Sequence, residues 1–276
     1  MTEHFVGRVG EGKRLAIIAI CNLTSVQNKP YATHLQFAFR LARDNPDFQF
    51  LLYTPYRMSI ANFRNSAATA ALNAEAEYLM FLDDDAVLID TSSLFKDLLN
   101  KIDKHENRHI VMPVVYVRGY PFEPMFFKWV TNEEELIEGK GLTFYSDFKE
   151  DLKNGKANED KLLEVAAIGC HTCLIKTEVF KAIEAPYFLT GLYNTEDVYF
   201  CMKLRDYIEN IGIFVATDIC SSHLLDPLYV NDQNVDLLRK LYKELGMDVE
   251  KIIEDFLDQP EAIKTELDEM GEVFEK

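Results

Sequence analysis

Short apolar runs recur along the first 117 residues, with amphipathic segments between them. Apolar runs of this length, rich in β-branched or aromatic residues, are typical of buried parallel strands. The predicted strands are Leu15–Cys21, Phe48–Tyr53, Tyr78–Leu82 and Ile110–Val117. Helical spacing and alanine content predict helices between them at Tyr31–Arg43, Asn62–Ala76 and Leu94–Ile102, the last capped by Thr91 or Ser92. This alternation predicts a three-layer α/β/α sandwich with a mostly parallel central sheet.

The pattern changes after residue 130. Residues 131–164 are acidic and contain three glycines, so we expect a surface insertion or flap. Beyond it the pattern predicts short strands at Val165–Ile168 and Cys173–Ile175, helices at Glu178–Ile183 and Glu196–Ile208, and a strand at Ile213–Thr217. From Asn231 the sequence is helical and increasingly acidic. We therefore expect an α/β domain over residues 1–230 and a helical C-terminal extension over residues 231–276.

The net charge of −17 is concentrated in two segments. Residues 247–276 hold 11 acidic and 3 basic side chains, and residues 131–164 hold 10 and 5. The rest of the chain is close to neutral and has no dense Lys/Arg cluster. Because affinity for nucleic acid comes mainly from neutralised phosphates, this distribution disfavours tight DNA binding.

The length of the apolar runs and the surroundings of the cysteines indicate in which cellular compartment the protein is expected. The longest apolar run, Leu15–Cys21, is far shorter than the roughly 20 residues that span a bilayer. The first residues also lack the apolar stretch of a secretion signal. Of five cysteines, four lie in apolar or strand-like surroundings, which predicts reduced, buried thiols. We expect a cytoplasmic protein with no membrane partner, and Cys170–Cys173 as a pocket wall rather than a redox or zinc motif.

Three aspartates follow the predicted strand Tyr78–Leu82 directly. Ligands bind at the carboxyl ends of strands in open α/β sheets. Alternation along an extended chain would place Asp83 and Asp85 on one side and Asp84 on the other. Two close carboxylates repel unless a cation lies between them, and Mg²⁺ or Mn²⁺ suits oxygen ligands. A solvent-exposed acidic loop is the alternative.

Two enzyme classes carry a D-x-D motif after an apolar strand. Residues 83–87 formally match D-x-D-x-[TV] of haloacid-dehalogenase-like phosphatases, in which the first aspartate, here Asp83, is a nucleophile. The other class is the nucleotide-sugar glycosyltransferases of the GT-A fold, in which D-x-D holds the metal and the donor diphosphate. The phosphatase motif normally lies on the first strand of its domain, whereas two strand–helix units precede it here. This position favours the transferase.

Further segments resemble GT-A glycosyltransferases of the family-2 type, including phage and bacterial members. They are A-N-F-R-N-S followed by E-Y-L-M-F-L-D-D-D, then IVMPVVYVRGYP, Ala167–Lys176, Ala185–Phe188, Thr195–Cys201 and Ser222-His223. Thr195–Cys201 is similar to the family's sEDvdFc motif, and Ser222-His223 falls where metal-dependent members carry a histidine ligand. The match covers Leu15 to Leu225.

The resemblance implies a divalent cation, Mn²⁺ or Mg²⁺, held by Asp85 and His223, with Asp83 on the metal or the ribose and Asp84 in the same nucleotide-binding stretch. Such a cation neutralises the charge that develops on the leaving diphosphate. The family takes its catalytic base from the Glu-Asp pair, which implies Asp197 as base and Glu196 as an acceptor-orienting or helix-capping residue. The alternatives are a loop histidine and acidic residues favoured by a helix start.

Other candidates are assigned less directly. Arg64 presents a planar fork suited to a diphosphate or base contact, and a surface salt bridge is its alternative. Asn22 and Thr24 follow the first strand and are expected near the nucleotide base, together with Arg57. Four more side chains are candidate acceptor or sugar platforms, with ordinary packing as the alternative: Tyr116, Arg118, Trp129 and Tyr193.

The predicted function is a metal-dependent, inverting glycosyltransferase. Its expected donor is a nucleotide diphosphate sugar, a UDP-sugar by resemblance, and its acceptor a hydroxyl on a glycan, a small molecule or a modified DNA base. A phage-encoded enzyme would act in the host cytoplasm. The alternatives are the phosphatase with Asp83 as nucleophile and a non-catalytic nucleotide-sugar-binding module. The chain lacks Q-x-x-R-W, which disfavours a processive synthase, and its C-terminal helices are a candidate homo-oligomer contact.

Overall fold

A computed structural model describes residues 12–21, 28–55, 58–88, 93–130, 141–191, 195–225 and 228–244. Its centre is a seven-stranded sheet of order β2-β1-β3-β10-β5-β11-β8. These strands are β1 Arg14–Cys21, β2 Phe48–Tyr53, β3 Tyr78–Asp83, β5 Arg108–Val114, β8 Leu162–Glu164, β10 Thr172–Lys176 and β11 Gly212–Cys220. β1, β2, β3, β5 and β11 run in one direction, and β10 and β8 run against them.

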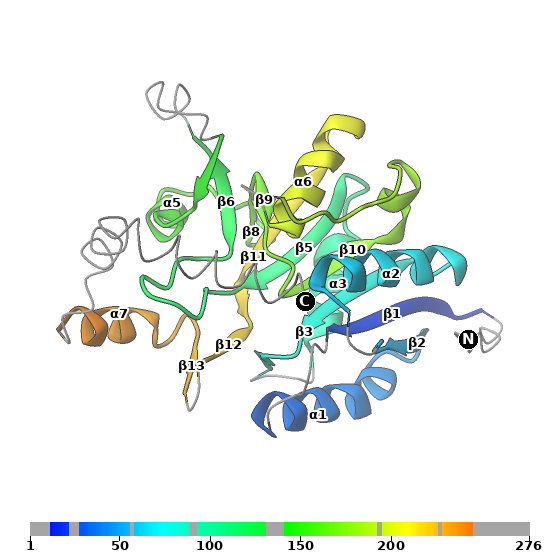
Figure 1. Ribbon diagram of the computed structural model, residues 1–276, viewed down its shortest axis with the longest axis horizontal. Coiled ribbons are helices and arrows are strands. Elements are labelled where there is room, and N and C mark those ends of the chain that lie inside the picture. Colours follow the sequence, from blue (N-terminus) through cyan, green and yellow to red (C-terminus); the bar gives the residue numbers. More distant parts are fainter. Residues whose placement is uncertain are drawn as a thin grey trace, which may run out of the picture.

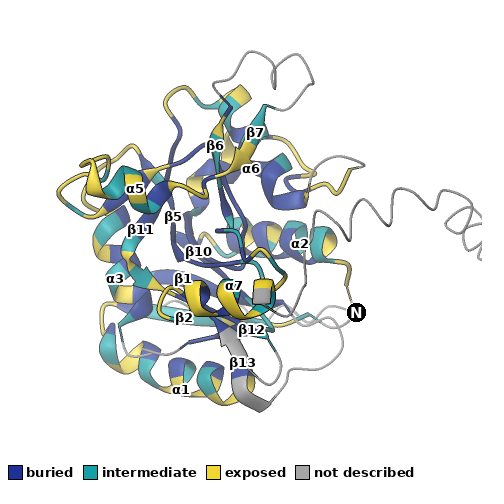
Figure 2. Ribbon diagram, turned by 90° about the vertical axis from the view of Figure 1, so that its left-hand side faces the viewer, coloured by how far each residue is buried: buried dark blue, intermediate teal, exposed yellow. Residues whose placement is uncertain are grey.

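Alternation along the strands explains why helices cover both faces of this sheet. In β1, Ala16 and Ile18 pack with α1 (Asn28–Asp44) and α3 (Leu94–Ile102), whereas Ile17 and Ala19 pack on the other face with α2 (Ile60–Asn73) and α6 (Glu196–Tyr207). Figure 1 shows α1 and α6 on opposite sides of the sheet. The central strands β1, β3, β5 and β10 are buried, and the outer faces of α1 and α7 (Val235–Glu244) are exposed (Figure 2). The predicted α/β sandwich with a mostly parallel sheet is confirmed.

The predicted boundaries differ from the observed ones at a few elements. The strand expected over Ile110–Val117 ends at Val114, because Tyr116 pairs with Pro124 in an isolated bridge. The helix expected over Glu178–Ile183 is a short 3₁₀ helix, η1, at Thr177–Lys181. The cap expected at Thr91 or Ser92 lies outside the described residues.

Two three-stranded sheets flank the main sheet. One contains β4 (Ala86–Val87), β12 (Ser222–Leu225) and β13 (Leu228–Val230), in the order β13-β12-β4. The other contains β6 (Phe126–Trp129), β7 (Leu142–Phe144) and β9 (Ala167–Ile168), in the order β7-β6-β9. The first continues from the ends of β3 and β11, and it therefore carries the residues that follow those strands.

The acidic stretch 131–164 was expected to be a surface insertion or flap. Residues 131–140 lie outside the described residues, and the remainder is built into the fold. β8 forms an edge of the main sheet beside β11, with Leu162 and Leu163 buried, and β7 pairs with β6. Between them lies α5 (Phe148–Lys153), with Phe148 buried. Burial of the apolar pair Leu162-Leu163 stabilises this segment in the fold, although the net charge of the stretch predicts an exposed one.

The described part of the C-terminal extension packs on the domain. Val235 and Leu238 of α7 are buried in the main core, and Tyr242 stacks on Tyr120 with ring centroids 6.2 Å apart. Residues 245–276, the rest of the candidate oligomer contact, lie outside the described residues.

All five cysteines carry free thiols, four of them buried, as the sequence predicts. In the described part of the chain, no helix combines the length and apolar character needed to cross a membrane.

Candidate active site

Five strands of the main sheet have an end at one edge, where its parallel strands finish. β1 and β3 end side by side at Cys21 and Asp83, and β5 and β11 end beside them at Val114 and Cys220. β10 begins at the same edge, and the amide of Asp83 donates a hydrogen bond to the carbonyl of His171 at 2.9 Å. This is the edge at which α/β sheets bind ligands.

The carboxylate of Asp85 lies between two imidazoles at this edge. His223 Nε2 is 3.0 Å from Asp85 Oδ2, and His171 Nε2 is 3.6 Å from Asp85 Oδ1. The two rings lie 4.5 Å apart, centroid to centroid, and one potential ligand atom from each of the three residues lies within 4.8 Å of the others. One carboxylate and two imidazoles form a common ligand set for a divalent transition metal.

Local sequence explains this meeting. β3 ends at Asp83, and Asp84 and Asp85 make a turn into β4. β4 pairs antiparallel with β12, with His223 opposite Ala86, and the amide of Leu224 donates to the carbonyl of Asp85 at 2.9 Å. The turn breaks the alternation expected for an extended chain. Asp83 therefore faces α2, whereas Asp85 faces the histidines.

Backbone and side-chain contacts orient both rings. His223 Nδ1 lies 2.9 Å from the carbonyl of Tyr116, which only accepts, so Nδ1 carries a proton and Nε2 faces Asp85. His171 Nδ1 lies 3.0 Å from the hydroxyl of Thr172, and its Nε2 is buried without a hydrogen-bond partner among the described residues. An unsatisfied buried polar atom costs roughly 1–3 kcal/mol. A cation at the three ligand atoms would give this nitrogen a partner, so the residues fit a divalent metal.

The protonation states of Asp85 and His171 at neutral pH also suit a metal. Burial alone would raise the pKa of Asp85, but the hydrogen bond and charge of His223, with help from His171 and Arg118, lower it to about 2. Burial lowers the pKa of His171 well below its usual value, and the nearby His223 lowers it further. Metal ligands must be deprotonated, and Asp85 and His171 meet this requirement at pH 7.

Arg64 is buried beside this cluster, only 2% exposed. Its Nε donates to Glu196 at 3.0 Å, its Nη1 to the carbonyl of Cys170 at 2.8 Å, and its Nη2 lies 3.3 and 3.4 Å from the oxygens of Asp83. The guanidinium also lies over the ring of Phe81. Burial raises the pKa of Asp83 to about 7, although Arg64 opposes the rise. This placement favours a positioning role for Arg64 over the predicted diphosphate or base contact, and over the surface salt bridge that was its alternative.

Glu196 and Asp197 begin α6, and both are buried. Asp197 Oδ1 accepts from the amide of Val198 at 2.8 Å and from the hydroxyl of Thr195, and Oδ2 accepts from the amide of Cys170 at 3.2 Å. The backbone amide and carbonyl of Cys170 therefore connect the carboxylate of Asp197 to Arg64, and the next residue is His171. The same backbone segment thus positions both the predicted base Asp197 and the candidate metal ligand His171.

Other predicted site residues are placed differently. Tyr116 was a candidate platform, but it is fully buried and donates to Asp232 at 2.8 Å, so it is a core residue. Trp129 is half exposed, and Asp84 lies in the turn between Asp83 and Asp85. Four expected contacts lie outside the described residues: Asn22, Thr24, Arg57 and Tyr193.

His171 was not predicted as a ligand. It lies inside the apolar stretch E-V-A-A-I-G-C-H-T-C-L-I, which was interpreted through its two cysteines as the wall of a pocket. A single ionisable side chain between buried apolar residues, directly before a predicted strand, is the signal that could have identified it.

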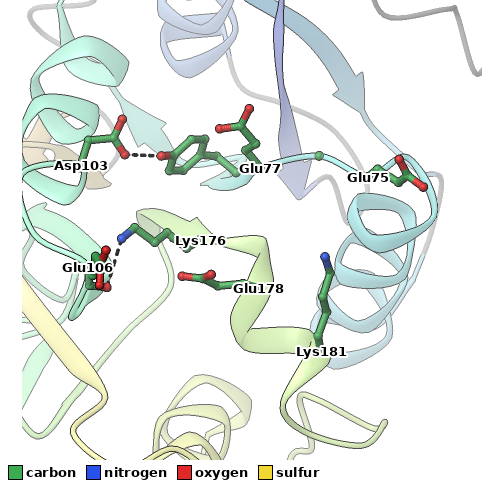
Figure 3. A pocket seen from close by; sticks show the side chains of 9 residues that line it. Glu75, Glu77, Asp103, Glu106, Lys176, Glu178 and Lys181 are labelled. Carbon is green, nitrogen blue, oxygen red and sulfur yellow. Dashed lines mark hydrogen bonds between the residues drawn. The ribbon is translucent and has the colours of Figure 1, made fainter.

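A separate pocket of about 540 Å³ lies at the opposite edge of the sheet, where β3 begins. Five acidic side chains and two lysines line it (Figure 3). Glu77 and Asp103 pair with Arg14, and Lys176 donates to the carbonyls of His105 and Glu106. Three of the seven charged lining side chains therefore have partners of their own, and the pocket lies away from the ligand-binding edge.

No protein-family model matches the sequence, and no curated protein matches it. Among solved structures, A197 from STIV is similar at a TM-score of 0.44 and 18% identity, over 76% of this chain and 85% of that one. The 4-diphosphocytidyl-2C-methyl-D-erythritol synthase from Anaerococcus prevotii DSM 20548 gives 0.39 and 12%, over 84% and 100%. A glycosyltransferase involved in glycosylation of the major capsid of PBCV-1 gives 0.31 and 10%, over 66% and 71%. Values this low assign neither an activity nor a functional residue to this chain.

Proposed function

We propose that the protein is a metal-dependent, inverting glycosyltransferase that moves a sugar from a UDP-sugar to a hydroxyl on a glycan, a small molecule or a modified DNA base. The observation that carries this proposal is the Asp85–His171–His223 cluster at the carboxyl edge of the sheet. The Nε2 of His171 is its most informative atom: it is buried, makes no hydrogen bond within the described part of the chain and faces Asp85 at 3.6 Å, which supports a ligand between the three side chains.

The imidazoles bear on the choice of metal. Imidazole is a ligand of first-row transition metals, most of all those later than manganese, whereas magnesium takes oxygen ligands almost exclusively and retains several waters. The ligand set therefore favours Mn²⁺ over Mg²⁺. When bound, the cation would supply positive charge to the departing diphosphate, an effect worth several kcal/mol in related chemistry.

Asp197 is the proposed base. Its carboxylate is held by three donors and stands at the N-terminus of α6. It would take the proton of the acceptor hydroxyl as the hydroxyl oxygen attacks the anomeric carbon and the nucleotide diphosphate leaves. General base catalysis of this kind contributes typically 10²–10⁴-fold. Glu196 would keep Arg64, and through it the Cys170 carbonyl, in place.

The phosphatase alternative is less well supported. It needs an oxygen of Asp83 that can attack a phosphorus atom. Both oxygens of Asp83 instead face the buried guanidinium of Arg64 at 3.3 and 3.4 Å. The geometry therefore favours a structural role for Asp83.

Release of UDP from a panel of UDP-sugars, measured with and without Mn²⁺, tests the proposal. We expect Mn²⁺-dependent release that Asp85→Asn abolishes. Asp197→Asn should retain Mn²⁺-dependent UDP binding and lose turnover. His105→Gln, which changes an exposed histidine near the opposite edge, is the matched control and should behave as wild type. Wild-type protein that binds UDP but turns over no donor would support a non-catalytic binding module instead.

A further inference from the structure

An exposed guanidinium lies on the metal-ligand cluster. Arg118 Nη1 donates to Asp85 Oδ2 at 3.0 Å, and 65% of the Arg118 side chain is exposed. The same oxygen is 3.0 Å from His223 Nε2. A cation bound at Asp85 would therefore compete with Arg118 for one carboxylate oxygen.

The backbone that carries Arg118 is fixed on both sides. The amide of Val117 donates to the carbonyl of Glu123 at 2.9 Å, which closes the loop at its base. At the tip, Arg239 of α7 donates to the carbonyls of Pro121 at 2.9 Å and Phe122 at 2.8 Å. The loop is thus tied to the C-terminal helix, and the exposed side chain of Arg118 is the part that is free to change partner.

We propose that Arg118 binds a phosphate of the donor and that Asp85 holds it in place until metal and donor arrive. This inference rests on the proposed function. The guanidinium has five N–H donors in a planar fork that matches phosphate oxygens, and its contact with Asp85 is a single exposed ion pair. When a metal binds Asp85, the guanidinium of Arg118 would leave that carboxylate and bind the diphosphate. It would therefore stay paired with an anion throughout.

Two effects of opposite sign follow from the exchange. Arg118→Gln removes a competitor for Asp85, so Mn²⁺ affinity should rise about two- to fivefold, the range of an exposed ion pair. The same variant loses a charge-assisted phosphate contact, so UDP affinity at saturating Mn²⁺ should fall roughly tenfold or more. A residue that only supported the loop would weaken both ligands together.

Isothermal titration of the full chain with Mn²⁺ alone, and then with UDP at saturating Mn²⁺, measures both effects. Arg118→Lys keeps the charge without the fork and should retain part of the UDP affinity. Arg43→Gln removes an exposed arginine paired with its neighbour Asp44 and should match wild type for both ligands. Wild-type UDP affinity in Arg118→Gln, or a parallel loss of Mn²⁺ affinity, would overturn the inference and leave the proposed function standing. Wild-type protein that binds no nucleoside diphosphate with Mn²⁺ would overturn both.

Discussion

Replacing Arg64 with methionine distinguishes a structural arginine from one that contacts substrate. Arg64 is 2% exposed, and its guanidinium lies between the carboxylates of Asp83 and Glu196. Methionine keeps an unbranched apolar stem that can pack on Phe81, where the guanidinium now lies. The variant therefore removes the positive charge while leaving most of the local volume filled.

The expected cost follows from the two carboxylates left without a partner. Removing one member of a buried ion pair typically costs about 3–5 kcal/mol. The side chain of Glu196 is 9% exposed and that of Asp83 is 21% exposed, so water can partly solvate Asp83. We therefore expect Arg64→Met to lower the free energy of unfolding by an amount near the lower limit, about 3 kcal/mol. For a domain of this size that corresponds to a melting temperature lower by roughly 6–12 °C.

The loss of stability in Arg64→Met should depend on pH. In the wild-type protein the pKa of Asp83 is already raised from 3.8 to about 7 by burial, and loss of Arg64 removes the main opposing charge. A carboxyl group with a raised pKa binds more protons in the folded state than in the unfolded state. Stability therefore falls as pH rises between about 4 and 7. The difference between variant and wild type should be larger at pH 7.5 than at pH 5.5.

Guanidinium chloride unfolding, followed by circular dichroism at both pH values, measures the effect. Arg43→Met removes an exposed arginine and should change the free energy of unfolding by less than about 0.5 kcal/mol. Adding Glu196→Gln to Arg64→Met should recover part of the loss, because it removes one unpaired charge. An Arg64→Met protein within 1 kcal/mol of wild type but with weakened UDP binding would refute the structural role and support the diphosphate contact.

Three further predictions concern the candidate metal ligand His171, the sheet residue Gly212 and the buried His34. His171→Gln should weaken Mn²⁺ binding by more than roughly tenfold, measured by titration calorimetry, and reduce the preference for Mn²⁺ over Mg²⁺. Gly212→Ala should cost about 3 kcal/mol in denaturant unfolding, because its Cβ would lie 2.0 Å from the Asn107 carbonyl; Gly119→Ala, with open space around it, is the control. Burial lowers the pKa of His34, so the unfolded state binds more protons below pH 6.5; the melting temperature should fall from pH 7 to 5.5, and less steeply in His34→Gln.

The sequence predicts the main sheet well because hydrophobic periodicity is a local signal. β2 and α3 fall at the predicted residues, and β1 and β3 differ from prediction by one residue each. The acidic stretch was interpreted less well. Its net charge predicts an exposed segment, but Leu162 and Leu163 are buried. Their burial depends on pairing with β11, which lies about 50 residues further along the chain. Such pairing is decided by tertiary contacts that periodicity does not report.

The site was predicted in part. The motif order placed Asp85 and His223 at one edge, and the structure brings them within 3.0 Å. The role of His171 depends on the antiparallel insertion of β10 between β3 and β5, which no local pattern indicates. Arg64 was predicted as a diphosphate or base contact, with a surface salt bridge as the alternative, because arginine is usually exposed. Its burial is explained only by two carboxylates that come from distant segments.

The unusual groups of this protein are adjacent through the backbone. Asp83 and His171 share a backbone hydrogen bond, and the Cys170 peptide contacts both Arg64 and Asp197. Buried charge lowers stability, and so does the His171 Nε2, which makes no hydrogen bond to any described residue, so a chain selected for stability alone would fill this edge with apolar side chains, as it does along β3. Their concentration at the ligand-binding edge is therefore best explained by chemistry. A stability-optimised variant that replaces His171 and Arg64 together should fold well only if Asp83 and Glu196 are neutralised with them.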